Sequence, residues 1–255
     1  MPPADKTGRV CPPARTFDMM LLVEKNEVNM DQLTYWGHAA FLLDLAGYTV
    51  LIDPFLEGNP FAPLRADQAP ADFILVTHGH DDHIGDSTPI ARRTGATVIS
   101  NAEICRWLRA QGVKTHSQHL GGGFRHPFGY VKMTAALHGS PLPDCGYGGN
   151  PGGFLITTRQ GKRLYFAGDT GLFGDMRLIG EGGLDLAVLP IGGNYTMDPE
   201  DALKAVRLLN PARVIPMHYD TFDVIAQDVD EWAARVRRET GADALILRPG
   251  EALEL

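Results

Sequence analysis

The chain has 255 residues, of which 44% are hydrophobic and 21% are charged, a composition typical of a globular protein that buries a substantial core. Its formal net charge of -8 disfavours a general attraction to the phosphate backbone of a nucleic acid. No apolar run approaches the roughly 20 residues that a membrane-spanning helix needs.

Cysteine use and the first residues of the chain bear on its location. Cys11, Cys105 and Cys145 are odd in number and form no CxxC pair, so a disulfide framework is not expected. The apolar run at residues 19–23 is too short for the core of a signal peptide. We therefore predict a cytoplasmic protein with a disordered or loosely docked extension over residues 1–29, followed by one domain over residues 30–255.

Three short strands are predicted at the start of this domain, over residues 33–36, 41–45 and 49–52. His38 lies between the first two strands, and a lone histidine beside a strand is more often structural than a metal ligand. Asp53 ends the third strand. It either orients a ligand histidine through the second ring nitrogen or caps the turn before Pro54.

The most informative stretch follows a fourth predicted strand, which ends at Val76 and runs directly into the sequence T-H-G-H-D-D-H. Alternate residues share a face on an extended backbone, so His78 and His80 can point the same way. Asp82 and His83 follow where the chain turns. Because imidazole and carboxylate are ligands of zinc, manganese and iron, we predict a metal site rather than a polar loop that is rich in histidine.

The next part of the chain alternates helices with a strand, which is typical of α/β layering. Helices are predicted over residues 87–94 and 102–111 around a strand at 97–99, and Asn101 is the expected cap of the second helix. The glycine-rich region that follows contains three histidines that we expect at the surface rather than at the metal site: His116, His119 and His126.

Later strands are predicted at residues 131–137, 154–158, 162–167, 184–191 and 213–217. A histidine or an aspartate stands just beyond three of them: His138, Asp169 and His218. The loops at residues 139–153 and 192–197 would lie beside a site at these strand ends. They supply three candidate substrate contacts: Tyr147, Asn194 and Tyr195.

The T-H-G-H-D-D-H stretch resembles the T-H-x-H-x-D-H signature of the metallo-β-lactamase superfamily, and G-D-T at residues 168–170 is similar to a second motif of that superfamily. G-H-A at 37–39 and P-I-G-G-N-Y-T-M at 190–197 resemble one branch of it. That branch comprises bacterial metal-dependent hydrolases, ascorbate-phosphate-lactonase-like proteins and N-acyl-phosphatidylethanolamine phospholipase D. The resemblance covers residues 31–255. It implies an α/β fold, a four-layer αββα sandwich with two similar halves.

The resemblance also implies a binuclear site with two divalent metal ions, for which zinc is the first choice and manganese or iron are alternatives. It assigns His78, His80 and His138 to the first metal, Asp82, His83 and His218 to the second, and Asp169 to a bridging position. We expect Asp82 and Asp169 to take part in catalysis. His38 is expected beside them as a further catalytic residue and not as a first-choice metal ligand.

Such a site implies hydrolysis by a metal-bound hydroxide, acting on a small-molecule ester, lactone, amide or phosphodiester. A nucleic-acid phosphodiesterase of the same superfamily is an alternative that the acidic charge disfavours, and we expect no nucleic-acid partner. A catalytically idle metal-binding scaffold is a second alternative, which the complete ligand set disfavours. β-Lactamase activity is not expected, because the branch-specific motifs differ. A homo-oligomer would follow the habit of the family.

Overall fold

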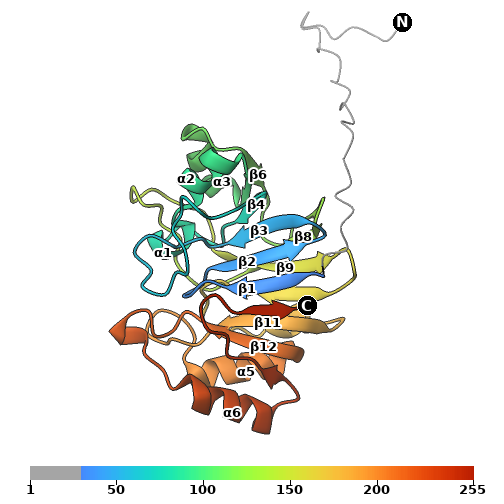
Figure 1. The fold of residues 1–255 in the computed structure, drawn as a ribbon. Helices are drawn as coiled ribbons and strands as arrows, with labels where there is room; N and C mark the ends of the chain where they lie inside the picture. The colour runs from blue at the N-terminus through green and yellow to red at the C-terminus, as the bar shows by residue number, and fades with distance from the viewer. Residues whose placement is uncertain (1–29) are drawn as a thin grey trace, which may run out of the picture.

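The computed structural model describes residues 30–255, so the expectation for residues 1–29 lies outside the described residues. Two seven-stranded sheets pack face to face (Figure 1). The first sheet has the order β14-β1-β2-β3-β4-β5-β6. Its strands are β1 (Gln32–Tyr35), β2 (Phe41–Leu45), β3 (Tyr48–Ile52), β4 (Phe73–Leu75), β5 (Thr97–Ser100), β6 (Thr115–Ser117) and β14 (Ala252–Glu254).

The second sheet has the order β13-β12-β11-β10-β9-β8-β7. Its strands are β7 (Gly123–His126), β8 (Gly129–Ala135), β9 (Gly152–Thr158), β10 (Arg163–Phe166), β11 (Leu184–Pro190), β12 (Pro211–Met217) and β13 (Asp243–Ala244). In each sheet four strands pair antiparallel and the pairing then becomes parallel, at β3–β4 in the first sheet and at β10–β11 in the second. This common pattern confirms the two similar halves.

Helices cover the outer faces of the two sheets, which completes the predicted four layers (Figure 1). They are α1 (Asp81–Ile84), α2 (Ser87–Thr94), α3 (Ala102–Ala110), α4 (Met176–Gly180), α5 (Pro199–Leu209) and α6 (Val229–Glu239), with a 3-10 turn at Asp223–Ile225. Asn101 caps α3 by accepting a hydrogen bond from the backbone N–H of Ile104 at 2.8 Å, as expected. No helix among residues 30–255 is long and apolar enough to cross a membrane.

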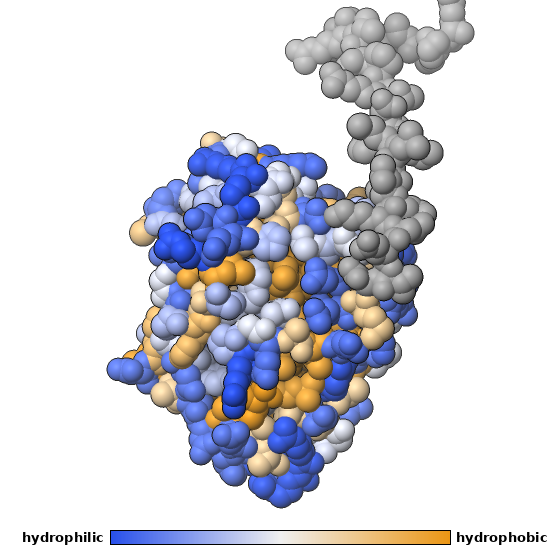
Figure 2. All heavy atoms as spheres, viewed as in Figure 1, coloured by the Kyte–Doolittle hydropathy of each residue, from blue (hydrophilic) through white to orange (hydrophobic). Residues whose placement is uncertain are grey.

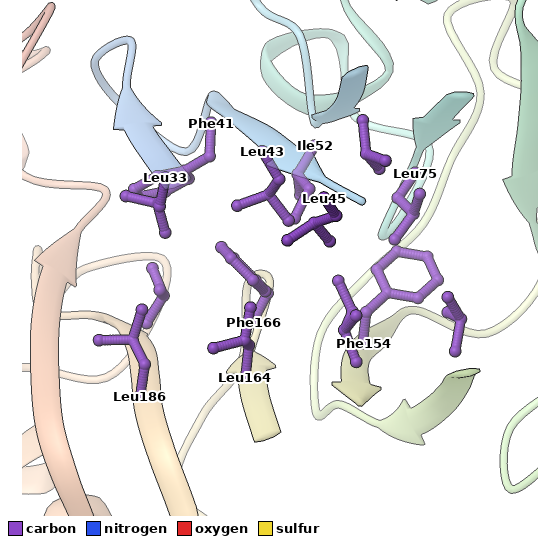
Figure 3. Close-up of a cluster of buried hydrophobic side chains, with 14 of the residues drawn as sticks. Leu33, Phe41, Leu43, Leu45, Ile52, Leu75, Phe154, Leu164, Phe166 and Leu186 are labelled. Carbon is purple, nitrogen blue, oxygen red and sulfur yellow. The ribbon is translucent and has the colours of Figure 1, made fainter. Parts of the chain in front are cut away.

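The main core lies between the sheets, and alternation along each strand decides which side chains enter it. In β2, Phe41, Leu43 and Leu45 are buried while the residues between them are less so. Figure 3 shows these side chains facing Phe154, Phe166 and others from the second sheet. On the face viewed in Figure 2, polar side chains dominate over the outer helices and apolar ones gather between the two helical layers.

Strand direction places the candidate ligands together. β8, β10 and β12 run the same way, so their carboxyl ends lie at one edge of the second sheet. His138, Asp169 and His218 follow these three ends. In the first sheet, β3 and β4 run parallel and lead to Asp53 and His78.

The expectation of a surface position is wrong for His126, which is only 7% exposed. Its ring stacks on Phe128 with centroids 5.5 Å apart, and Phe73 of the first sheet lies against it. His116 is half-buried beside it, and His119 is exposed. The glycine-rich region contains the edge strands β6 and β7, and the two sheets meet around His126 at this end of the sandwich. Periodicity alone did not indicate this contact.

Burial, with a smaller contribution from His116, lowers the pKa of His126 to about 4 from the usual value near 6.5. Between these two values the unfolded chain binds more protons than the folded protein, so stability falls as the pH drops from about 6.5 to 4. His126→Gln keeps a donor toward Gln118 Oε1, which lies 3.2 Å from His126 Nε2, but does not titrate.

As the pH drops through this window, the free energy of unfolding of the variant is therefore expected to fall by on the order of 2 kcal/mol less than that of the wild type. Urea unfolding of both zinc-loaded proteins at pH 4.5 and 6.5 measures the difference. Equal losses in the two proteins would contradict the assignment.

Candidate metal centre

The structure brings together all seven side chains that the sequence suggested as metal ligands. Together with His38 they form two groups of four, and within each group the potential ligand atoms lie within 4.8 Å of one another. The first group contains His78, His80, His138 and Asp169, and the second contains His38, Asp82, His83 and His218. The two halves of the fold each contribute to both groups, because the strand ends of both sheets meet here.

Asp169 lies between the two groups. Its Oδ1 atom is 3.2 Å from His83 Nε2, and its Oδ2 atom is 3.1 Å from His218 Nε2. The same Oδ2 atom is 3.5 Å from His138 Nε2 and 4.0 Å from His78 Nε2 in the first group. One buried carboxylate therefore reaches both groups.

The first group consists of three imidazole nitrogens that converge on one another. His80 Nδ1 lies 2.9 Å from His78 Nε2 and 3.2 Å from His138 Nε2. Burial lowers the pKa of all three histidines, which favours the neutral form that binds a metal. Neutral nitrogens at these distances are suited to share a cation.

Thr77 fixes the ring of His78. The Thr77 hydroxyl donates to Asp53 Oδ2 at 2.6 Å, so it accepts from His78 Nδ1, which lies 3.0 Å away. The proton on Nδ1 leaves His78 Nε2 free to face the other ligands. Thr77 belongs to the sequence motif, but its hydrogen bond to Asp53 could be found only in the folded structure.

Asp53 orients a second ligand, His83. His83 Nδ1 donates to Asp53 Oδ2 at 2.8 Å, and the backbone N–H of Thr77 donates to Asp53 Oδ1 at 2.8 Å. Of the two interpretations of Asp53, the structure therefore supports the one in which it orients a ligand histidine. His83 Nε2 is thereby turned toward Asp169.

Several buried polar atoms at this point lack a hydrogen-bond partner among the described residues: His83 Nε2, His218 Nε2 and Asp169 Oδ1. Buried polar atoms in folded proteins almost always have a partner, and a divalent cation would supply the missing one. The donors are nitrogen and oxygen without thiolate, a set that suits zinc, manganese or iron. The residues present therefore fit a metal centre.

The charges of the two carboxylates agree with this assignment. Burial raises the pKa of Asp169, but His218 and His83 outweigh it and hold the pKa of that carboxyl well below its usual range. Burial likewise raises the pKa of Asp82, but His218 and His38, whose Nε2 atoms lie 3.7 and 3.1 Å from Asp82 Oδ2, bring it below its usual value. Both carboxylates are thus anionic at neutral pH, the form in which they bind a cation.

His38 is fully buried beside the second group. Its Nε2 atom is 3.1 Å from Asp82 Oδ2, and its Nδ1 atom is 2.8 Å from Thr221 Oγ1. Burial lowers the pKa of His38 to about 4, so its ring is neutral. The sequence placed His38 near the site but gave no signal for Thr221.

Three residues at the centre have a left-handed backbone: His38, Asp53 and His218, with φ of 57°, 42° and 56°. This conformation is uncommon outside glycine and costs on the order of 1 kcal/mol at each position. Strain of this kind persists where surrounding contacts hold the chain, and such positions gather at functional sites.

A pocket of about 350 Å³ opens onto the centre. It is lined by His80, Asp81, Asp82, His138, Asp169, Tyr195 and His218. Of the three candidate substrate contacts, Tyr195 lines the pocket, whereas Asn194 and Tyr147 are exposed and do not. A larger cavity of about 610 Å³ lies beside β8 and α4 and touches none of the candidate ligands.

Comparison with known proteins agrees with this fold. Residues 48–219 match the beta-lactamase superfamily domain. A UPF0173 metal-dependent hydrolase of Heliobacterium modesticaldum is 49% identical over 234 residues, which cover 89% of this chain and 98% of that protein. Its counterpart in Thermus thermophilus is also 49% identical and covers 89% of this chain and 100% of that protein.

Two solved structures extend the comparison. Igni18, a metallo hydrolase of the archaeon Ignicoccus hospitalis, aligns with a TM-score of 0.80 at 38% identity, covering 88% of this chain and 98% of that one. An isothiocyanate hydrolase from gut bacteria of Delia radicum aligns with a TM-score of 0.70 at 21% identity, covering 88% of this chain and 98% of that one, and shows the shared fold alone. The chain belongs to the beta-lactamase superfamily and, within it, to the UPF0173 metal-dependent hydrolase family. The branch suggested by the sequence motifs is thus confirmed.

Proposed function

We propose that the protein is a hydrolase with a binuclear metal centre. The observation that carries this proposal is the position of Asp169, whose two carboxylate oxygens lie within 3.1 to 4.0 Å of histidine nitrogens from both groups. A bridging anion of this kind lets two cations stand about 3.5–4 Å apart without prohibitive repulsion. The names of the relatives, which are metal-dependent hydrolases, support the same function.

Bound divalent cations would supply activation of water and polarisation of the carbonyl or phosphoryl oxygen under attack. His78, His80, His138 and Asp169 would hold the first cation, and Asp82, His83, His218 and Asp169 the second. Zinc is the first choice, with manganese or iron as alternatives.

The chain itself prepares the reaction through its anionic and donor groups. Asp82 and Asp169 stay ionised and line the pocket, where they would accept hydrogen bonds from the attacking water. The exposed Tyr195 lines the same pocket and is placed to donate a hydrogen bond to the substrate oxygen that gains charge.

The pocket favours a small-molecule substrate. Its volume of about 350 Å³ lies in the usual range for such sites. No lysine or arginine is among the described residues that line it, and the net charge is -8, so the nucleic-acid phosphodiesterase alternative lacks the cationic groups that track a phosphate backbone. An ester, lactone, amide or phosphodiester of small size fits best.

Cys105 and Cys145 are both free thiols, one buried and one exposed. Free thiols are stable in a reducing compartment, which supports the cytoplasmic location proposed from the sequence. The homo-oligomer stays a prediction.

The test combines elemental analysis of the purified protein with hydrolysis of bis(p-nitrophenyl) phosphate and of a p-nitrophenyl ester. We expect about two metal ions per chain and turnover that chelators abolish, because both substrates need the same centre. Absence of retained metal after reconstitution with zinc, manganese and iron would overturn the ligand assignment. Two bound metals without turnover of any substrate class would favour the idle scaffold instead.

A further inference from the structure

His38 stands in a buried chain of hydrogen bonds that the proposed mechanism does not use. This chain runs from the Thr221 hydroxyl through the ring of His38 to the carboxylate of Asp82. Thr221 and His38 are 183 positions apart in the sequence. The ring of His38 is fully buried, so its two nitrogens depend on these two partners for hydrogen bonds.

The two partners decide which ring nitrogen carries the proton. An ionised carboxylate only accepts hydrogen bonds, so His38 Nε2 donates to Asp82 Oδ2 at 3.1 Å. The other nitrogen of a neutral imidazole then accepts, and the Thr221 hydroxyl donates to it at 2.8 Å. A competing acceptor for this hydroxyl, the carbonyl oxygen of Tyr219, is farther away at 3.4 Å.

We propose that His38 is a positioning residue that orients Asp82 and is not itself a metal ligand, with Thr221 fixing its Nε2-protonated tautomer. This inference rests on the proposed metal centre and adds to it. His38 Nε2 lies within 4.8 Å of ligand atoms of the second group, so distance alone would admit it as a ligand. A nitrogen that donates its proton to Asp82 has no lone pair left for a cation.

The same residue also orients His218. The carbonyl oxygen of His38 accepts a hydrogen bond from the backbone N–H of His218 at 2.9 Å, and the two rings lie with centroids 4.1 Å apart. Asp82 follows strand β4 of the first sheet and His218 follows strand β12 of the second, and His38 contacts both residues. A change in the ring of His38 is therefore expected to weaken the second metal position and spare the first.

Two amide variants separate the roles of the two ring nitrogens. The amide nitrogen of glutamine reaches the position of imidazole Nε2, whereas that of asparagine reaches only the position of Nδ1. His38→Asn is therefore expected to weaken the second zinc equivalent by about 10- to 100-fold and to leave the first unchanged. His38→Gln keeps a donor toward Asp82 and should stay within a few-fold of the wild type. Asparagine tolerates the left-handed backbone, so strain does not explain the loss that is expected in His38→Asn.

Zinc affinities come from chelator competition. A matched pair, Thr221→Val and Thr221→Ser, tests the other end of the chain of hydrogen bonds. Valine keeps the shape without the hydroxyl and should weaken binding of the second zinc equivalent, whereas serine keeps the hydroxyl and should preserve that binding. Unchanged zinc binding in His38→Asn, or equal loss in His38→Asn and His38→Gln, would overturn the positioning role. The first result would leave His38 a packing residue, and the second would make it a ligand.

The tautomer itself is measured by 15N NMR of the histidine rings, in zinc-loaded and in metal-free wild-type protein. A proton on Nε2 in both states is expected, and an unprotonated Nε2 in either would refute the proposal. A wild-type protein that binds none of zinc, manganese and iron would refute the metal centre. The metal-free spectrum would still decide between the tautomers, so the two failures are distinguishable.

Discussion

Asp169→Asn is expected to lose the second metal ion and to reduce turnover by more than about 100-fold. A loss of about 100-fold is the upper end for substitutions of residues that only orient a ligand, and Asp169 is proposed as a ligand itself. The physical reason is charge. Two unit charges 4 Å apart repel by about 4 kcal/mol at an effective dielectric constant of 20, so two divalent cations repel by about 16 kcal/mol. The anionic carboxylate of Asp169 offsets this repulsion, whereas a neutral amide of the same shape does not.

Elemental analysis and kcat/KM measured on the same preparations test this result. Cys145→Ser is the control, because Cys145 is an exposed free thiol that lies outside both ligand groups. It should keep full metal content and turnover. An Asp169→Asn protein with two metals and wild-type turnover would remove Asp169 from the centre.

Asp53→Asn is expected to weaken zinc binding at the second position by about 100-fold, although residue 53 touches no metal in the proposed centre. Asp53 accepts a hydrogen bond from His83 Nδ1, so that the lone pair of His83 Nε2, which faces Asp169, would be available to a cation. An asparagine that presents its amide N–H to the ring would favour the other tautomer, with the proton on Nε2 where a cation should bind. Asparagine also accepts the left-handed backbone at this position, with φ 42°.

Asp72→Asn is a matched control for this substitution. The Asp72 carboxylate accepts hydrogen bonds from the backbone N–H and the hydroxyl of Thr49, as Asp53 does from Thr77, but it lies outside both ligand groups. The control should lose some stability and keep its zinc affinity, measured by chelator competition. Equal zinc affinities in the two variants would show that Asp53 does not act through His83.

The sequence predicted much of the fold because local patterns reflect local structure. Alternation identified β2 and β3, and Asn101 marked the start of α3. The short edge strands β6, β7, β13 and β14 were not among the strands predicted above. Edge strands of two to four residues carry too little periodicity to be recognised, and their pairing partners decide whether they form.

The candidate ligands could also be selected from the sequence, because His78, His80, Asp82 and His83 lie within six positions and the others follow strand ends. That selection depended on spacing and on resemblance to a family, both of which are properties of the sequence. Spacing and resemblance could not predict that His126 is buried. They also could not predict that Tyr195 lines the pocket while Tyr147 and Asn194 do not.

The folded structure revealed Thr221 as a group that orients a ligand, and it decided between the two interpretations of Asp53. Asp53 meets His83 across 30 positions, and Thr221 meets His38 across 183. Such hydrogen bonds depend on how two sheets pack and how their loops fold over the shared edge, which no local pattern records. Residue type and spacing define which side chains can bind a metal, whereas the packing of the two halves sets which ring nitrogen each of these histidines presents.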